Sequence, residues 1–132
     1  MRRLLVVLAA GHLLLAACSK SGVAGASRED DAATLQMMRE EIDKLIEDRS
    51  CGASPDCAFI AAGSKPCGGP WRYLVYSRPN VDEALLREKI DALNSFEHLY
   101  NLTHRIVSDC AVPPVPVPGC VRGACVDTAA AP

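Results

Sequence analysis

Seven cysteines in a chain of 132 residues limit the fold of this protein more than any other feature of its sequence. Six of them lie between residues 51 and 125, and the seventh stands alone at position 18. In an oxidising compartment cysteines pair into disulfides, and a short chain with a small core gains most from them. Because seven is an odd number, one sulfur atom needs another role. The surroundings of Cys18 indicate that it is this one.

The residues before Cys18 have the pattern of a secretory signal peptide. Arg2 and Arg3 form a basic start, and a largely apolar run of 14 residues extends from Leu4 to Ala17. This order of a basic and an apolar region is typical of secretory signals. A membrane-spanning helix needs about 20 apolar residues, so the run is too short for a permanent anchor. We therefore expect residues 1–17 to be a signal peptide.

Leu15-Ala16-Ala17-Cys18 resembles the lipobox of bacterial lipoproteins, in which a branched apolar residue and two small residues precede an obligatory cysteine. The resemblance covers only the signal region and Cys18. It implies cleavage before Cys18, a thioether-linked diacylglycerol on this residue and acylation of its new amino group. It implies no other cofactor. Each buried methylene contributes about 0.8 kcal/mol, so several acyl chains on one residue make membrane attachment effectively permanent.

The residues after Cys18 bear on the membrane and on the distance from it. In Gram-negative lipoproteins an aspartate at this place favours the inner membrane, whereas Ser19 and Lys20 stand here. The resemblance therefore implies the outer membrane. Residues 18–27 are mostly small and polar and contain glycine, which predicts a flexible lipidated tether with a mean span of about 15–18 Å.

With Cys18 carrying lipid, six cysteines remain, and an even number in an oxidising compartment predicts three disulfides. A bond between Cys110 and Cys120 is disfavoured, because prolines keep the segment between them extended over about 25 Å. Disulfide-bonded Cα atoms lie within about 7 Å of each other. A bond between Cys120 and Cys125 is sterically allowed, and the other connectivities stay open. The predicted disulfide residues are Cys51, Cys57, Cys67, Cys110, Cys120 and Cys125.

Residues 28–132 are expected to form one domain with the element order α-β-β-α-β. Periodicity predicts a helix over 29–49, which Ser27 or Asp30 can cap. Asn80, with Glu83 three residues later, is expected to cap a second helix that continues to about Ile106. The predicted core stripes are Leu35, Met38, Ile42 and Leu45 in the first helix, and Leu86, Ile90, Leu93, Phe96, Tyr100 and Val107 in the second.

Two strands are expected between these helices. The first is the apolar run 57–62, and the second is 71–76, which is rich in aromatic and β-branched residues. Alternation gives the second strand apolar bulk on both faces, which predicts a central position in its sheet. Residues 120–126 predict a small hairpin or a final strand. The expected architecture is a disulfide-stapled α+β domain with two long helices packed on a small antiparallel sheet.

The least ordinary local sequence is the turn-rich stretch between the two predicted strands. Glycines there allow tight backbone conformations and prolines stiffen the chain, so the stretch is a candidate binding loop. A tight connection pinned by Cys67 is the alternative. Residues 51–126 loosely resemble small cysteine-rich secreted bacterial domains without an assigned activity. The candidate loop residues are Lys65, Pro66, Gly68, Gly69 and Pro70.

Catalytic and metal chemistry have little support in this sequence. No C-x-x-C pair occurs, and His98 and His104 point about 120° apart around a helix, so we expect no metal site. Glu97, Asn101 and His104 share a helix face and offer the best acid/base cluster, although a hydrogen-bonded helix flank is the commoner reading. Cysteines paired in disulfides offer no nucleophile.

The net charge and the predicted location in the cell envelope together favour a binding role. Without Arg2 and Arg3 the 14 basic residues become 12 against 16 acidic ones, a formal charge of −4, and no basic patch stands out. Nucleic acid is therefore not an expected partner. The leading hypothesis is an envelope lipoprotein, not an enzyme, whose domain binds or supports an envelope or extracellular protein. The alternatives are an inhibitor of a protease or lysozyme, acting through its rigid loops around 66–70 and 111–119, and a small periplasmic enzyme.

Overall fold

A computed structural model describes residues 27–130, so Cys18 and the predicted signal lie outside the described residues. Helix α1 (Arg28–Leu45) begins at a capping box. The Asp30 amide donates to Ser27 Oγ at 3.1 Å, and the Ser27 amide donates to the Asp30 carboxylate at 3.2 Å, so both predicted capping residues take part. The helix ends at Leu45, four residues before the predicted end at Arg49, and Leu45 is only half-buried. The next residue, Ile46, is buried in its place.

Strands β1 (Cys57–Ala62) and β2 (Arg72–Ser77) form a two-stranded antiparallel sheet, with Cys57 opposite Ser77 and Ala62 opposite Arg72. The prediction that β2 is central is therefore wrong. Its inner face, which carries Leu74 and Tyr76, packs into the core. On its outer face, the half-buried Tyr73 packs edge-to-face against the exposed Phe59 of β1, so apolar residues on both faces of β2 did not require a second neighbouring strand.

Helix α2 (Glu83–His104) follows the short 3-10 turn η2 (Arg78–Asn80). Asp82, and not the predicted Asn80, caps it by accepting from the Ala84 and Leu85 amides at 3.0 and 3.1 Å. Asn80 instead donates to the Ser50 carbonyl. The helix ends at His104, because Arg105 adopts a left-handed conformation with φ 51°.

A second two-stranded sheet closes the domain. The 3-10 turn η1 (Ser54–Asp56) lies before β1, and β3 (Pro118–Val121) pairs with β4 (Ala124–Asp127) in an antiparallel hairpin. Positive φ angles at Arg122 and Gly123 suit its two-residue turn. Of the two predicted alternatives for this region, the hairpin is therefore the correct one. The order is α-β-β-α-β-β, with two small sheets where one was expected.

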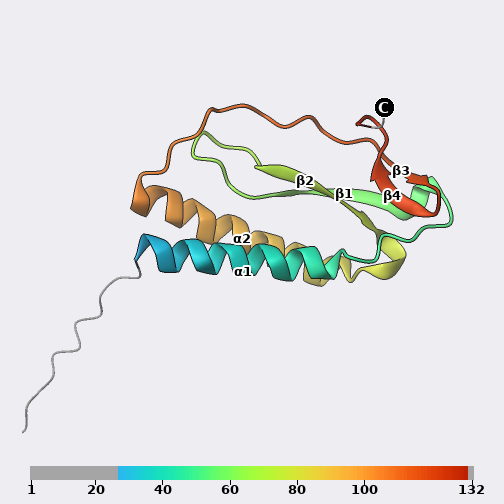
Figure 1. The fold of residues 1–132 in the computed structure, drawn as a ribbon, viewed down its shortest axis with the longest axis horizontal. Helices are drawn as coiled ribbons and strands as arrows, with labels where there is room; N and C mark the ends of the chain where they lie inside the picture. The colour runs from blue at the N-terminus through green and yellow to red at the C-terminus, as the bar shows by residue number, and fades with distance from the viewer. Residues whose placement is uncertain (1–26, 131–132) are drawn as a thin grey trace, which may run out of the picture.

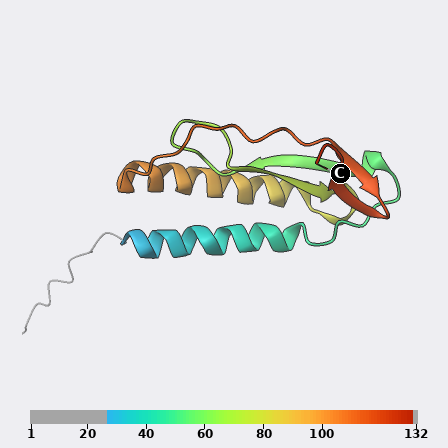
Figure 2. The ribbon, with the colours of Figure 1, turned by 45° about the horizontal axis from the view of Figure 1, so that its top comes forward.

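The helices lie side by side along one face of β1–β2, and the β3–β4 hairpin lies at one end (Figures 1 and 2). The apolar stripes of the two helices pack against the β1–β2 sheet and form one core. Its buried residues come from α1, β1, β2 and α2, and Ile46 joins them just after α1. Val107 does not join this core, contrary to prediction, because the chain has left the helix and the side chain is 86% exposed. Within the described part of the chain, neither helix is both long and apolar enough to cross a bilayer. The core residues are Leu35, Ile42, Ile46, Ala58, Ala62, Leu74, Tyr76, Leu86, Ile90 and Leu93.

Three disulfides are present and use all six predicted cysteines. They are Cys51–Cys120, Cys57–Cys125 and Cys67–Cys110. Cys120 and Cys125 face each other across the hairpin but bond to other residues, so the sterically allowed pair does not form. Cys110 and Cys120 are likewise not joined, as predicted from the extended segment between them. Two bridges fasten the C-terminal hairpin to the region around β1, and the third fastens two loops.

Candidate functional site

The Cys67–Cys110 disulfide joins the two proline-rich segments that the sequence singled out separately. One is the hairpin loop, residues 63–71, which connects β1 to β2. The other is the strap, residues 111–117, which leads to β3. The strap runs along the side of β1–β2 that faces away from the helices (Figures 1 and 2). Both cysteines of the bridge are exposed, so the paired loops form a surface feature of the domain.

Helix α2 holds the base of the hairpin loop through three polar side chains. Asn94 Oδ1 accepts from the Gly63 amide at 2.8 Å, and Glu97 Oε2 accepts from the Ser64 amide at 2.7 Å. Asn101 Nδ2 donates to the Ser64 carbonyl at 2.6 Å. These bonds replace the ladder partners that the backbone loses where the strands separate, which fixes the loop on the helix.

Gly63 allows this close approach between the loop and the helix. Its φ is +91°, and a Cβ atom there would lie 2.7 Å from Trp71 Cδ1 and 2.9 Å from Glu97 Oε2. Any larger residue would need both a strained backbone and displaced neighbours. The glycine therefore sets the position of the whole loop above α2.

Glu97 is a structural anchor and not part of an acid/base cluster. Its side chain is buried and pairs with Arg39 of α1, while its second oxygen holds Ser64. His104 lies apart from it and bonds through Nε2 to Asp31 Oδ2 at 2.7 Å. The three residues proposed from the helix face are thus divided between two sets of contacts. In the described residues they present no shared catalytic geometry.

Lys65 connects the hairpin loop to the strap. Only 8% of it is exposed, and its ammonium group donates to the Ala111 carbonyl and, at 3.2 Å, to Asp109 Oδ1. It also lies 4.8 Å from the centroid of the Trp71 ring, which is a cation–π distance. Of the five candidate loop residues, Lys65 is thus an internal link. Pro66, Gly68 and Gly69 are exposed, and Pro70 is half-buried.

Backbone bonds make the exposed tip of the hairpin loop compact. The Gly68 amide donates to the Lys65 carbonyl at 2.9 Å, and the Lys65 amide donates to the Gly69 carbonyl at the same distance. Gly68 and Gly69 have φ near +90° and +82°, which residues with a Cβ adopt at a cost. The tip is therefore a tight turn, tied at Cys67 to the strap.

The strap presents one side to the domain and the other to solvent. Three residues per turn of polyproline II place Pro113 and Pro116 on the same side, and Pro116 is buried while Pro113 is half-buried. Val112 is 73% exposed and Val115 58% exposed on the other side. At the far end, the Thr128 amide donates to the Val117 carbonyl at 2.9 Å. The strap is thus anchored at both ends with exposed valines between.

Asp109 fixes the start of the strap and gives it a pH dependence. The Ala111 amide, which donates to Oδ1 at 3.1 Å, and the nearby Lys65 ammonium hold the pKa of Asp109 below its usual value of 3.8. A carboxyl whose pKa is lower in the folded state stabilises the protein at pH values above its unfolded-state pKa. This contribution is lost as the pH falls through the folded-state pKa.

We therefore expect Asp109→Asn to lower the Tm at neutral pH, because asparagine keeps the acceptor but loses the charge near Lys65. The difference in Tm from the unchanged protein should close as the pH falls below the lowered folded-state pKa of Asp109, where the aspartate also becomes neutral. Thermal melts followed by circular dichroism measure it. Asp91→Asn, an exposed position on α2, is the matched control and should leave the Tm unchanged. If the Tm difference between Asp109→Asn and the unchanged protein were the same at neutral and at acidic pH, this account would be contradicted.

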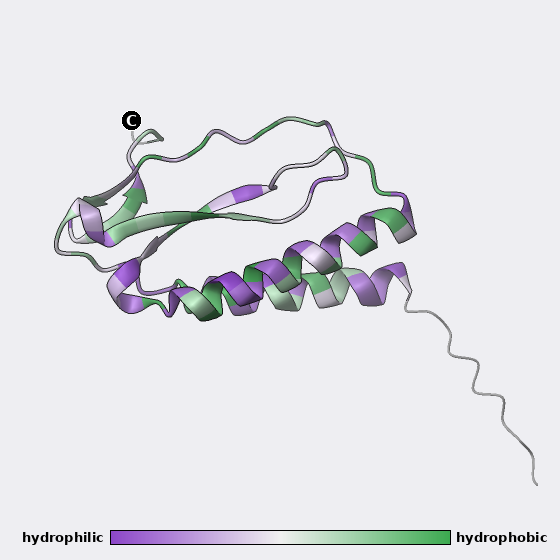
Figure 3. Ribbon diagram, turned by 180° about the vertical axis from the view of Figure 1, so that it is seen from behind, coloured by the Kyte–Doolittle hydropathy of each residue, from purple (hydrophilic) through white to green (hydrophobic). Residues whose placement is uncertain are grey.

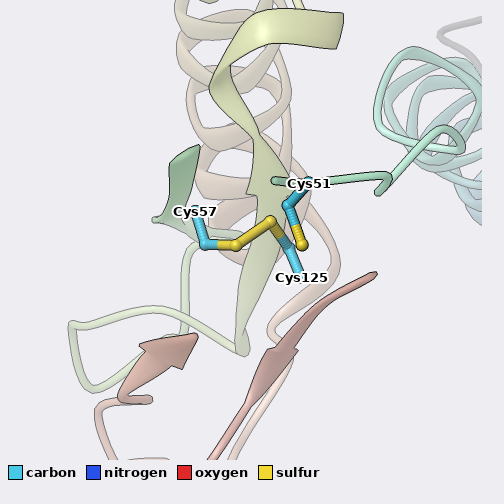
Figure 4. Close-up of side chains that lie close together, drawn as sticks. All are labelled: Cys51, Cys57 and Cys125. Atoms are coloured by element: carbon cyan, nitrogen blue, oxygen red, sulfur yellow. A yellow bond between two sulfur atoms is a disulfide. The ribbon is translucent and has the colours of Figure 1, made fainter. Parts of the chain in front are cut away.

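Two other groupings do not form a binding site. The sulfur atoms of Cys51, Cys57 and Cys125 lie within 4.8 Å of one another (Figure 4), which matches a metal-ligand cluster in spacing only. All three belong to disulfides, and metals bind thiolates. An open hollow along α1 is lined only by exposed charged residues, Glu40, Asp43 and Lys44 on the helix and Glu47 just after it.

Sequence reasoning missed Arg39, Asn94 and Asp109 as residues that position the paired loops. Asn94, Glu97 and Asn101 recur at helical spacing beside the apolar stripe of α2, and this polar row was the available signal. The contact between Asp109 and Lys65, 44 residues apart, left no local pattern. The chain significantly matches no protein-family model, no curated protein and no solved structure.

Proposed function

We propose that this protein is a lipid-anchored bacterial envelope protein whose domain binds another envelope or extracellular protein through the paired loops. The proposed localisation rests on residues 1–18, which have the signal pattern and the lipobox resemblance. Ser19 and Lys20 favour the outer membrane. The observation that carries the binding role is the joining of two exposed proline-rich loops by Cys67–Cys110 and by the buried Lys65. The domain itself is non-catalytic in this proposal.

Rigidity makes the paired loops suitable for recognition. Binding normally costs free energy because loops and side chains must be ordered, and a segment already fixed at both ends avoids much of this cost. The exposed valines of the strap and the exposed Trp71 offer apolar contact area beside accessible backbone groups. Aromatic residues often anchor protein interfaces. A protein surface with an apolar groove is the partner that this chemistry fits.

Capture from cross-linked envelopes tests the proposal. The tagged full-length protein should capture a defined protein, and Val112→Asp/Val115→Asp should reduce that capture at least tenfold, about 1.4 kcal/mol or more. Both valines are exposed, so the substitution should leave the Tm nearly unchanged. Val121→Asp is the matched control, because Val121 is also an exposed valine but lies in β3. Equal capture by all three proteins would refute a role for the strap.

Inhibition of a hydrolase is a second candidate, favoured by the compact exposed tip of the hairpin loop. A stiff turn bounded by a disulfide can occupy an active-site cleft without losing much conformational entropy. The detergent-solubilised protein can be incubated with proteases and lysozymes, and inhibition should then be lost on lengthening the tip between Gly68 and Gly69. Absence of inhibition at micromolar protein would remove this candidate and leave the binding role untouched.

A further inference from the structure

We infer that the domain rests on the membrane surface through an apolar patch at the end where residues 18–27 join it. The patch consists of Leu99 and Leu102 in the last turns of α2 and of Val107 just after the helix. Its proposed partner is the lipid bilayer itself. This inference rests on the lipid anchor of the proposed function and adds an orientation of the domain to it.

Contacts between the helices place the patch near the tether. Asp31 in the first turn of α1 bonds to His104 at the end of α2 at 2.7 Å, so the two helix ends lie together. The nine residues 19–27 span at most about 32 Å when fully extended. Helix α2 alone is about 33 Å long, and the β3–β4 hairpin lies at the other end of the molecule (Figure 1). The end with the patch is therefore the one held closest to the membrane.

The exposure of these side chains is not explained by the fold. Leu99 is 60%, Leu102 65% and Val107 86% exposed, although the other exposed residues of α2 are polar apart from Ala84 and Ala92. Leu99 and Leu102 are three residues apart and so are neighbours on one helix face. Both exposed large apolar residues of α2 fall within its last six residues. Figure 3 colours the final turn of α2 and part of the segment after it as hydrophobic, as it does the core stripes further along both helices.

Charge around the patch indicates apolar insertion and not attraction to anionic lipid. Arg28 and Arg105 are exposed there, but Glu29 and Asp30 are exposed beside them and offset their charge. Apolar side chains at an interface typically enter about 5–10 Å, to the boundary between headgroups and acyl chains. We therefore expect the contact to be nearly independent of salt concentration.

Tryptophan quenching by brominated lipid tests this orientation. The chain has one tryptophan, so Trp71→Phe removes the background signal. Leu102→Trp and Val121→Trp are then compared in this background, as full-length lipidated proteins in vesicles of phosphatidylcholine brominated near the top of one acyl chain. Leu102→Trp fluorescence should fall at least twofold relative to unbrominated vesicles, at both low and high salt. Val121→Trp, at the far end, should be unaffected.

Sedimentation with the vesicles separates this inference from the proposed anchor. If both proteins sediment with the vesicles and Leu102→Trp is not quenched, the orientation is wrong and the anchor stands. If neither protein sediments, the anchor fails and the inference fails with it. Equal quenching of both positions would also overturn the inference. Replacing Leu99 and Val107 by serine should restore Leu102→Trp fluorescence at least partly without releasing the protein from the vesicles.

Discussion

Replacing Glu97 by alanine is expected to lower the free energy of unfolding by about 3 kcal/mol, because it breaks a buried ion pair and removes a backbone acceptor. Glu97 is 3% exposed, pairs with Arg39 and accepts from the Ser64 amide at 2.7 Å. Its loss leaves a partly buried guanidinium without a carboxylate. A domain of this size is stable by about 5–15 kcal/mol, so this loss is a large share.

Urea denaturation followed by circular dichroism measures this effect. Glu97→Gln keeps the acceptor for Ser64 but loses the charge, so it should fall between the unchanged protein and Glu97→Ala. Glu88→Ala, at an exposed position on the same helix, is the matched control and should change stability by less than about 0.5 kcal/mol. In a double-mutant cycle, Arg39→Ala should cost less in the absence of Glu97 than in its presence. Independent effects of the two substitutions would contradict the proposed pairing.

Removing both bridges of the C-terminal hairpin is expected to cost far more than removing either one. Cys51–Cys120 and Cys57–Cys125 close loops of 69 and 68 residues. With one of them intact, the other closes only a short effective loop through residues 51–57 and 120–125. Because the intact Cys67–Cys110 bridge shortens each long loop to roughly 26 residues, the chain-entropy relation gives about 3 kcal/mol for either single bridge and about 6 kcal/mol for both. The second value rivals the whole stability of a small domain.

Paired alanine substitutions test this expectation. Cys51→Ala/Cys120→Ala and Cys57→Ala/Cys125→Ala should each fold with a lowered Tm, whereas the fourfold variant should be unfolded at 37 °C. Cys67→Ala/Cys110→Ala is the informative comparison, because that bridge is exposed and fastens the loops and not the core. It should retain the far-ultraviolet spectrum but change the fluorescence of Trp71, which lies against Lys65. A folded fourfold variant would show that the bridges do not hold the hairpin.

Helix periodicity predicted most of the core correctly. Leu35, Ile42, Leu86, Ile90 and Leu93 are all buried, because an apolar stripe of this kind has no other stable place than against a second apolar surface. The errors lie at the helix ends. Val107 continued the stripe in the sequence, but the left-handed Arg105 ended the helix before it. A stripe shows which residues share a helix face only as long as the helix continues.

The sequence by itself determined the number of disulfides, the α+β class and the main core residues. The number of cysteines and the spacing of apolar residues can both be read directly from the order of the residues. Only the tertiary structure decided which cysteines pair, that Lys65 and Glu97 are buried, and that the hairpin loop and the strap form one surface. These outcomes depend on contacts between residues 33 to 69 positions apart. No local pattern encodes such contacts, because their free energy appears only when the elements pack together.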